Sequence, residues 1–260
     1  MPERAKTAIA RAIVSRSGVG ADDLLVELGA GTGEIGLPLA CLPIRYVGLD
    51  ASVAMLRQFR AKAAGRTPSL ILADCDRAWP LRHGVAAVVF ASRVIHLLDP
   101  EHVMREVLRV GRPASHLMLG RVLREPDGIK ERLRRRRQGF LAEAGITPRE
   151  GTAGTRRVVA LCQTAGAQPL GRWVVAEWTG ETSPEEILAG WESLSRMGSI
   201  PVDPVTRDGI VAEVRSWARG ELGDLHRPEP FRERYAIDVV RLPSLPRVAG
   251  SAERSWKTKS

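Results

Sequence analysis

Short apolar runs alternate with more polar segments along the first half of the chain. Apolar runs of about 4–8 residues that are bounded by turn residues are typical of buried strands. Five such runs lie at residues 24–28, 44–50, 69–73, 85–91 and 116–122, and the segments between them predict helices at residues 33–41, 52–65 and 99–110. Because crossovers between parallel strands are right-handed, this alternation predicts an open, doubly wound, mostly parallel α/β sheet of the Rossmann-like class.

Local signals mark where several helices begin. Ser52 is a good N-cap residue. The tripeptide at residues 99–101, Asp-Pro-Glu, supplies a cap, a proline at the first helical position and an acidic first turn. Ser183 and Glu186 have the spacing of a capping box, which predicts a helix that runs through residue 194.

The second half of the chain adds strands at residues 170–179 and 231–242, which brings the expected sheet to seven strands. Helices are expected at residues 127–144, 155–165, 183–194 and 206–221, and an amphipathic helix at residues 4–16. The predicted organisation has an N-terminal helical cap and one domain with two helical insertions that form a lid over an acceptor pocket. Its limits are residues 1–20 for the cap, 21–242 for the domain, 123–150 for the lid segment, 181–223 for the helical insertion and 243–260 for a mobile tail.

Composition excludes several classes of protein. No apolar run reaches the roughly 20 residues that span a bilayer, because Arg93 and His96 interrupt the longest one. The amino terminus lacks the pattern of a secretory signal, since Arg4, Lys6 and Arg11 interleave with alanines. The three cysteines form no CxxC pair and suggest neither a disulfide framework nor a zinc site. We therefore expect a cytoplasmic protein without a membrane partner, and the oligomeric state stays open.

The chain is strongly basic, with a formal net charge of +9 and a pI near 10.3. Part of this charge forms a block at residues 130–137, which contains six cations and one acid, Glu131. Clustered cations neutralise phosphates, so a nucleic acid is one candidate partner. No aromatic residue interleaves with these cations, and a solvated helix face is the favoured interpretation.

A glycine-rich turn after the first predicted strand is the main candidate for ligand binding. Residues 31–36 fit the dinucleotide spacing G-x-G-x-x-G, whereas residues 27–33 fit E-x-G-x-G-x-G, so spacing alone leaves two classes of nucleotide ligand open. The Glu27 carboxylate favours a cationic or amine-bearing ligand, because it would repel a pyrophosphate. Asp50 ends the next strand about 20 residues further on, where a ribose acceptor is required.

This arrangement resembles the class I S-adenosylmethionine-dependent methyltransferases. The resemblance extends over about residues 20–122, through Trp-Pro-Leu at 79–81, the strand at 85–91, Val-Ile-His-Leu-Leu at 94–98 and Glu-Val-Leu-Arg at 106–109. The branch that contains the ubiquinone and menaquinone biosynthesis C-methyltransferases is the most similar. The chain departs from the family pattern at residues 113–115, where Pro-Ala-Ser replaces the usual Pro-Gly-Gly, and at Ala86, where an aspartate is common. These departures affect a turn and a strand start rather than the cofactor site.

The resemblance implies S-adenosylmethionine as methyl donor and S-adenosylhomocysteine as product, and no metal is expected. It assigns Asp50 to the ribose and Asp74 to the adenine slot, although Asp74 also suits a capped turn, and Cys75 or Asp76 are alternatives for the adenine. The expected cofactor-binding residues are Glu27, Gly29, Ala30, Gly31, Gly33, Asp50, Ala51, Met55, Asp74, Cys75, Ala91 and Ser92.

Methyl transfer from a sulfonium is an in-line displacement, so an enzyme supplies alignment, desolvation and, for a protic acceptor, a base. His96 follows the fourth strand at the edge where ligands bind, and it is our candidate base. A histidine that only holds the loop by hydrogen bonds is the competing interpretation. Arg93 is a candidate for an acidic substrate or the methionine carboxylate, or else a solvated arginine. Candidates for lining an acceptor pocket, unless they are plain core, are Phe140, Trp173, Trp178 and Trp191.

The expected function is therefore methyl transfer to an oxygen, carbon or nitrogen atom of a small-molecule acceptor. The alternatives are an RNA methyltransferase that uses residues 130–137 and an NAD-dependent dehydrogenase that uses residues 31–36. Residues 91–94 are Ala-Ser-Arg-Val, where methyltransferases of exocyclic amines have Asn/Asp-Pro-Pro-Tyr/Phe. The sequence does not identify the acceptor or the methylated atom.

Overall fold

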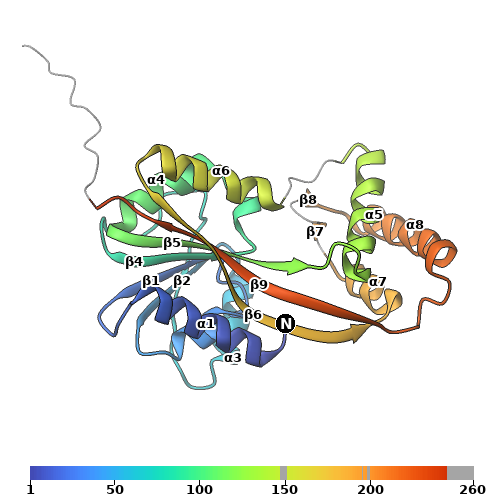
Figure 1. Ribbon diagram of the computed structural model, residues 1–260, viewed down its shortest axis with the longest axis horizontal. Helices are drawn as coiled ribbons and strands as arrows, with labels where there is room; N and C mark the ends of the chain where they lie inside the picture. The colour runs from blue at the N-terminus through green and yellow to red at the C-terminus, as the bar shows by residue number, and fades with distance from the viewer. Residues whose placement is uncertain (147–150, 195, 198–199, 245–260) are drawn as a thin grey trace, which may run out of the picture.

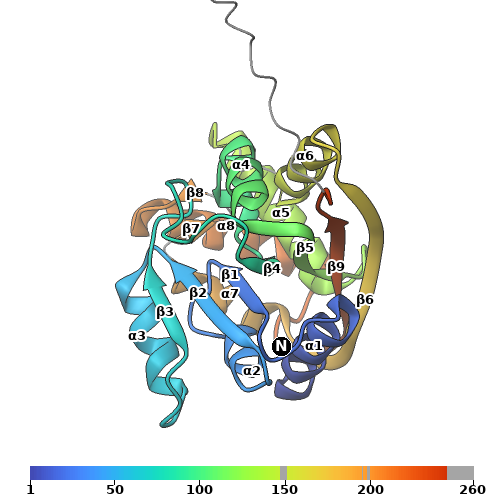
Figure 2. The ribbon, with the colours of Figure 1, turned by 90° about the vertical axis from the view of Figure 1, so that its left-hand side faces the viewer.

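A seven-stranded sheet organises the molecule. The computed structural model describes residues 1–146, 151–194, 196–197 and 200–244. The strands are β1 Leu24–Leu28, β2 Arg45–Asp50, β3 Ser69–Leu72, β4 Ala86–Ser92, β5 Gly111–Arg124, β6 Gln168–Thr182 and β9 Glu229–Arg241, with a separate pair, β7 Arg196–Met197 and β8 Ile200–Pro201. Their order is β3-β2-β1-β4-β5-β9-β6. The first five strands pair in parallel and β9 runs antiparallel to both neighbours, which confirms the predicted doubly wound, mostly parallel sheet (Figures 1 and 2).

Helices cover both faces of this sheet. They are α1 Glu3–Ser17, α2 Gly36–Ala40, α3 Val53–Lys62, a short 3-10 helix η1 Ile95–Leu97, α4 Pro100–Val110, α5 Ile129–Glu143, α6 Gly151–Thr164, α7 Pro184–Glu192 and α8 Pro204–Leu222. Successive strand residues point to opposite faces. Leu28 and Leu119 lie in one core, beneath α4 and α6, whereas Leu25 and Met118 lie in the other, beneath α1, α2 and α3. The parallel strands thus end together at one edge of a sheet that is buried on both sides.

Two elements differ clearly from their predicted bounds. The helix expected from Gly33 begins at Gly36, because Gly33 has a φ of 80°, which an α-helix does not accept. β5 is longer than predicted at both ends, since its first residue pairs with Ala86 of β4 and its last residues pair with β9, for example Arg124 with Glu233. Most of the predicted mobile tail, residues 245–260, lies outside the described residues.

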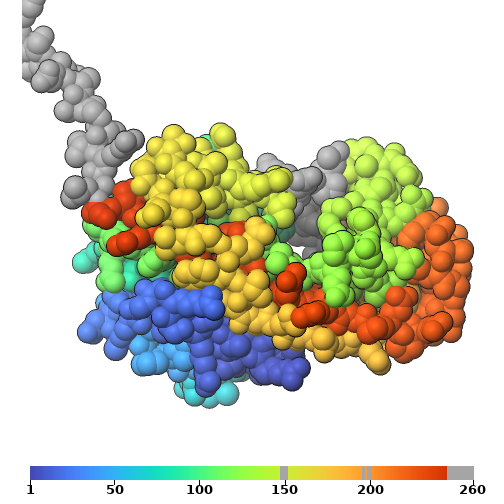
Figure 3. Space-filling view, in the orientation of Figure 1, coloured from blue at the N-terminus to red at the C-terminus, as the bar shows by residue number. Residues whose placement is uncertain are grey.

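The helices α5, α7 and α8, with β7 and β8, form a second layer that we call the lid. Its core is separate from the two cores of the sheet and contains Leu133, Leu141, Leu188 and Val214. β5, β6 and β9 extend from the sheet to this layer, at the right of Figure 1. Figure 3 shows α5 and α8 at one end of the molecule and α1 and α6 at the other. The lid is therefore held at the carboxyl edge of the parallel strands.

The capping box at Ser183 is confirmed and gives a test of lid stability. The Ser183 hydroxyl accepts a hydrogen bond from the Glu186 backbone N–H (3.2 Å), and the Glu186 carboxylate accepts one from the Ser183 N–H (3.0 Å). We expect Ser183→Ala to destabilise the protein by about 1 kcal/mol, because the helix loses a capping acceptor. Urea unfolding measures this loss. Ser193→Ala, at the other end of α7, is the control and should change stability little; equal losses in both variants would contradict the prediction.

Candidate active site at the carboxyl edge of the sheet

The turn between β1 and α2 depends on its glycines. Gly29, Gly31 and Gly33 have φ angles of 63°, 55° and 80°, in the left-handed region that glycine adopts without strain. A Cβ atom on Gly29 would lie 2.6 Å from a methyl carbon of Val94, and one on Gly33 would lie 2.6 Å from the Phe59 ring. The turn is thus packed against the start of the loop after β4 and against α3, and Gly29, Gly31 and Thr32 remain partly accessible.

Asp50 fastens the end of β2 to this turn. Its Oδ2 accepts a hydrogen bond from the Gly31 backbone N–H (2.8 Å), and its Oδ1 accepts one from the Ser52 N–H (2.8 Å). Each carboxylate oxygen keeps a further lone pair. Asp50 is therefore a fixed acceptor beside the glycine turn, in the place that the sequence assigns to it.

Glu27 lies beneath the turn and does not extend toward a ligand. Its side chain is buried, and its Oε2 accepts a hydrogen bond from the Tyr46 hydroxyl (2.6 Å). Burial raises the pKa of Glu27 to about 8, and the Tyr46 hydrogen bond opposes this only in part, while Asp50 raises it further. At neutral pH without a cationic ligand this carboxyl group holds its proton. The sequence suggests that the Glu27 carboxylate repels a pyrophosphate. A buried and protonated Glu27 does not act in this way.

The loop after β3 is built around two aspartates. Asp74 is exposed, and its Oδ1 accepts a hydrogen bond from the Asp76 N–H (2.9 Å), the capped turn that the sequence offered as its second interpretation. Asp76 in turn accepts a hydrogen bond from the Asp99 N–H (2.7 Å) at the start of α4. Cys75 between them is buried, and burial raises the pKa of its thiol to about 11. The Asp74 carboxylate is thus more accessible than the Cys75 thiol beside it.

Large apolar side chains are exposed beside Asp50. Met55 and Val53 at the start of α3 are 43% and 45% exposed, and Leu72 at the end of β3 is 56% exposed. These values are high for side chains of this kind, and all three residues belong to elements that flank the ends of β2 and β3. Met55 and Ala51, which is also exposed, are expected from the sequence, whereas Val53 and Leu72 are not, because a strand end and a helix start give no signal of exposure.

The loop after β4 crosses the front of the glycine turn. Ala91 is buried, and the Ser92 hydroxyl lies 2.5 Å from the hydroxyl of the buried Tyr235 on β9. Arg93 has a φ of 59°, and its exposed guanidinium forms an ion pair with Glu34 on the glycine turn. The proposed substrate-binding arginine is therefore paired within the chain. This ion pair joins the two loops on either side of the candidate cofactor site.

His96 lies on η1 and lines a cavity of about 630 Å³ between the start of α4 and the start of α6. Asp76, Glu101 and Arg157 line the same cavity, and Arg157 donates a hydrogen bond to Glu101 (2.7 Å) across it. Gly154 of α6 packs against the backbone of η1. The candidate base thus faces a space at the carboxyl edge that is large enough for a small molecule.

The aromatic candidates fall into two groups. Trp173 and Trp178 pack with the sheet; Trp178 is buried, and its indole N–H donates to Glu233 (3.1 Å). Phe140 and Trp191 belong to the lid, where each carries an arginine over its ring. The two lid residues remain the better candidates for contact with an acceptor, since they lie in the layer that faces the sheet edge.

The basic block of α5 is largely paired within the chain. Lys130 donates to Glu233 (3.1 Å), Arg134 to Glu131 (2.8 Å) and Arg135 to the Pro126 carbonyl (2.7 Å). Arg136 lies 4.0 Å from the centre of the Phe140 ring. The sequence suggests a solvated basic face; in the structure Arg135 is exposed, whereas Lys130 and Arg134 are half-buried and paired with carboxylates.

Two other features bear on the class of protein. Within the described residues, no His, Cys, Asp or Glu side chains gather in a group of three or more that could hold a metal ion. Over the same part of the chain, every helix is too short or too polar to cross a bilayer.

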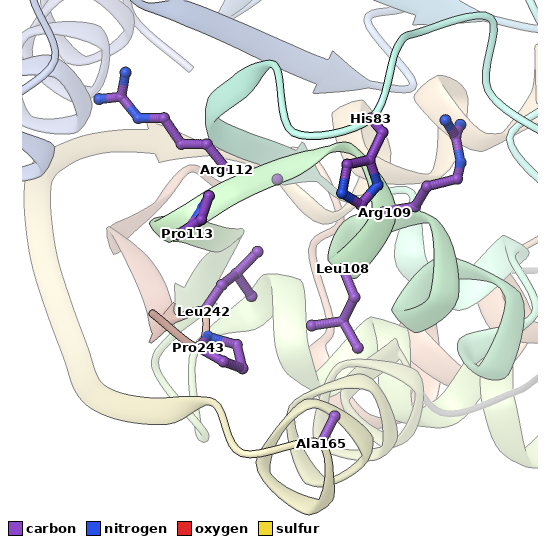
Figure 4. A pocket seen from close by; sticks show the side chains of 9 residues that line it. His83, Leu108, Arg109, Arg112, Pro113, Ala165, Leu242 and Pro243 are labelled. Carbon is purple, nitrogen blue, oxygen red and sulfur yellow. The ribbon is translucent and has the colours of Figure 1, made fainter. Parts of the chain in front are cut away.

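Another cavity, of about 350 Å³, lies at the opposite edge of the sheet, where β5 begins and β9 ends (Figure 4). Leu108, Pro113 and Leu242 give it apolar walls. Arg112 and Arg109 at its rim are directed away and pair with Asp23 and Glu106. It is therefore remote from the glycine turn and offers no charged group for catalysis.

Comparison with known proteins agrees with this geometry. Residues 26–119 match a family model described as a methyltransferase domain. Similar solved structures include a candidate type II methyltransferase from Anaeromyxobacter dehalogenans, with a TM-score of 0.60 and 21% identity over 92% of this chain and 97% of that one. Geranyl diphosphate C-methyltransferase from Streptomyces coelicolor has a TM-score of 0.51 and 14% identity, over 92% and 81% of the two chains. The (4+2)-cyclase SpnF has a TM-score of 0.56 and 20% identity, over 91% and 80%.

No curated protein sequence matches the chain. These three structures are so distant in sequence that they establish the fold and not the reaction.

Proposed function

This chain contains a methyltransferase domain of the class I S-adenosylmethionine-dependent type, and we propose that it methylates a small-molecule acceptor by in-line displacement. The observation that carries the proposal is the glycine turn with Asp50 fixed beside it, at the carboxyl edge of β1 and β2. Among class I methyltransferases, we place it nearest the ubiquinone and menaquinone C-methyltransferase branch, on the sequence of residues 94–98 and 106–109.

The residues present fit the methyl donor. The free lone pairs of Asp50 suit the two ribose hydroxyls as donors, and the exposed Met55 and Leu72 suit an adenine ring, which is flat and largely apolar. The backbone of the turn at Gly29 to Gly33 would lie along the methionine part. Asp74 would accept a hydrogen bond from the adenine amine. When bound, S-adenosylmethionine supplies a methyl group on a sulfonium, an already activated leaving group.

The chain itself contributes alignment, exclusion of water and a base. The loop after β4, which Ser92 ties to Tyr235, would hold the acceptor at the donor. The lid would cover the acceptor and exclude water. His96, on the wall of the adjoining cavity, would accept the proton of a hydroxyl or an acidic carbon as the methyl group is transferred.

Calorimetric titration of the purified protein with S-adenosylhomocysteine and with NADH tests the donor. We expect saturable binding of the former and none of the latter, and release of S-adenosylhomocysteine from S-adenosylmethionine when a panel of small acceptors is added. Failure to bind either S-adenosyl compound would refute the proposal. Binding of NADH alone would restore the dehydrogenase alternative.

A His96→Asn variant tests the base. With an acceptor that supports turnover, kcat should fall about 100-fold, because a positioned base contributes roughly 10²–10⁴ to such rates. Binding of S-adenosylhomocysteine should stay within about threefold of wild type. His83→Asn, at the cavity on the opposite edge, is the matched control. If His96 only holds its loop, the variant loses thermal stability while kcat and its pH profile stay unchanged.

The RNA alternative has less support than the sequence suggested. It needs cations available for phosphates, yet Lys130, Arg134 and Arg135 are engaged within the chain. Binding of RNA with an affinity that falls steeply with salt concentration would support the RNA methyltransferase alternative.

A further inference from the structure

Arg137 occupies a position on α5 where an apolar residue is expected. Leu133 and Leu141, four residues before and after it, are buried in the lid core. Residues four apart share a face of a helix, so the stripe that these leucines define turns Arg137 toward the interior of the lid. There its guanidinium lies 4.4 Å from the centre of the Trp191 ring on α7.

The charge on Arg137 is not compensated by a carboxylate among the described residues. Its buried Nε has no hydrogen-bond partner there. The charged groups that act on it are Arg134 and Arg124, both cations, and burial together with these two lowers the pKa of Arg137 to about 10. The guanidinium therefore stays charged at neutral pH. The side chain as a whole is half-buried. A charge that is partly withdrawn from water is stabilised by an opposite charge or by several acceptors, and the Trp191 ring supplies only part of that compensation.

The neighbouring cations differ from Arg137 in this respect. Arg124 donates to Glu233 (2.9 Å) together with Lys130, and Arg134 donates to Glu131. These three cations each contact a carboxylate, whereas Arg137 contacts none among the described residues.

The charge on Arg137 lies beyond the candidate active site. Gly120 of β5 pairs with Ser92 at the end of β4, and Arg124 follows four residues later. Four strand residues span roughly 13 Å. Arg124, whose charge acts on Arg137, is therefore about that far from the sheet edge, on the lid side.

We propose that Arg137 binds an anionic group, a carboxylate or a phosphate, on the methyl acceptor, while its guanidinium stays stacked on Trp191. A planar guanidinium forms paired hydrogen bonds with both of these groups. This inference rests on the proposed function for the identification of the ligand as the acceptor. It narrows the acceptor to a small molecule whose charged end lies in the lid, remote from the methylated atom.

Anion titrations test the proposal without a known acceptor. Wild-type protein, with and without saturating S-adenosylhomocysteine, is titrated with inorganic phosphate, pyrophosphate and acetate at constant ionic strength, and thermal stability and tryptophan fluorescence are recorded. At least one anion should raise Tm and change the fluorescence saturably, since a ligand of the folded state stabilises it. The phosphate and acetate arms distinguish a phosphorylated from a carboxylic acceptor. In Arg137→Met the affinity should fall about 10–100-fold, as loss of a charged hydrogen bond predicts.

Arg135→Met is the matched control, because Arg135 carries the same charge on the exposed side of the same helix. The inference is overturned if Arg137→Met responds to anions like wild type, or if Arg135→Met loses as much affinity. It is also overturned if Arg137→Met alone lowers Tm markedly, because removal of an uncompensated charge should leave Tm unchanged or raise it. Binding of S-adenosylhomocysteine is measured separately for each variant. Its absence would refute the proposed function, whereas its presence without an Arg137-dependent anion response would refute this inference alone.

Discussion

Replacing Asp50 by alanine should lower the affinity for S-adenosylhomocysteine at least 100-fold. The proposed pair of ribose hydrogen bonds to a carboxylate accounts for this loss, since each such bond is worth about 1.5–3 kcal/mol. The variant also leaves the Gly31 and Ser52 backbone N–H groups without the acceptor that Asp50 provides. The glycine turn therefore also loses the hydrogen bond that holds it to the end of β2. Isothermal titration calorimetry measures the effect directly.

Two further variants separate these contributions. Asp50→Asn keeps the shape of the side chain but replaces one acceptor oxygen by a donor, and it should fall between wild type and alanine. Asp208→Ala removes an exposed aspartate on α8 and should leave the affinity unchanged. If Asp50→Ala bound the ligand within threefold of wild type, the assignment of Asp50 to the ribose would be wrong.

Replacing Glu27 by glutamine should remove most of the loss of stability that the protein undergoes between about pH 5 and 9. The folded pKa of Glu27, about 8, lies above its value of 4.5 in an unfolded chain. Between these values Glu27 in the native state holds a proton that the unfolded state has lost. The contribution of Glu27 to stability is therefore complete below pH 4.5 and declines as the pH rises toward 8. A shift of this size corresponds to roughly 3–5 kcal/mol.

Urea unfolding at pH 5, 7 and 9 measures this dependence. Wild type should lose several kcal/mol over the range, while Glu27→Gln, which keeps an acceptor for the Tyr46 hydroxyl, should lose much less and be the more stable form at pH 9. Glu3→Gln, an exposed carboxylate on α1, is the control and should follow wild type. Parallel curves for Glu27→Gln and wild type would show that Glu27 is ionised in the folded protein.

The sequence predicted those features that depend on neighbours in the chain. The caps at Ser52, Asp99 and Ser183 were identified because the acceptor and the N–H group that it binds lie within three residues of each other. The order of strands and helices followed from periodicity, and the glycine turn followed from residue spacing. In each case the interaction is local and leaves a pattern in consecutive residues.

The remaining features depend on contacts between distant segments. Tyr46 gave no signal, because its role arises only when the parallel register of β1 and β2 brings its hydroxyl to Glu27. The last residues of β5 pair with β9, where Glu233 binds Arg124 although the two are more than 100 residues apart. Arg137 looked like one of several solvated arginines, since the sequence does not reveal that Trp191 covers it.

The continuity of β5, β6 and β9 limits how a substrate can reach the site. Backbone pairing with β9 continues from the sheet to the strand ends, with Arg124 of β5 opposite Glu233 and, after two register shifts, Thr182 of β6 opposite Glu229. Three hydrogen-bonded strands resist bending, so the lid cannot swing on a hinge as a domain joined by a flexible linker does. Access must then come from local displacement of single helices or loops, such as those joined by the Arg93–Glu34 ion pair. The sheet edge that would bind the methyl donor and the lid that would cover the acceptor are consequently held in a fixed relative position. Only short segments at the site can move to admit a substrate.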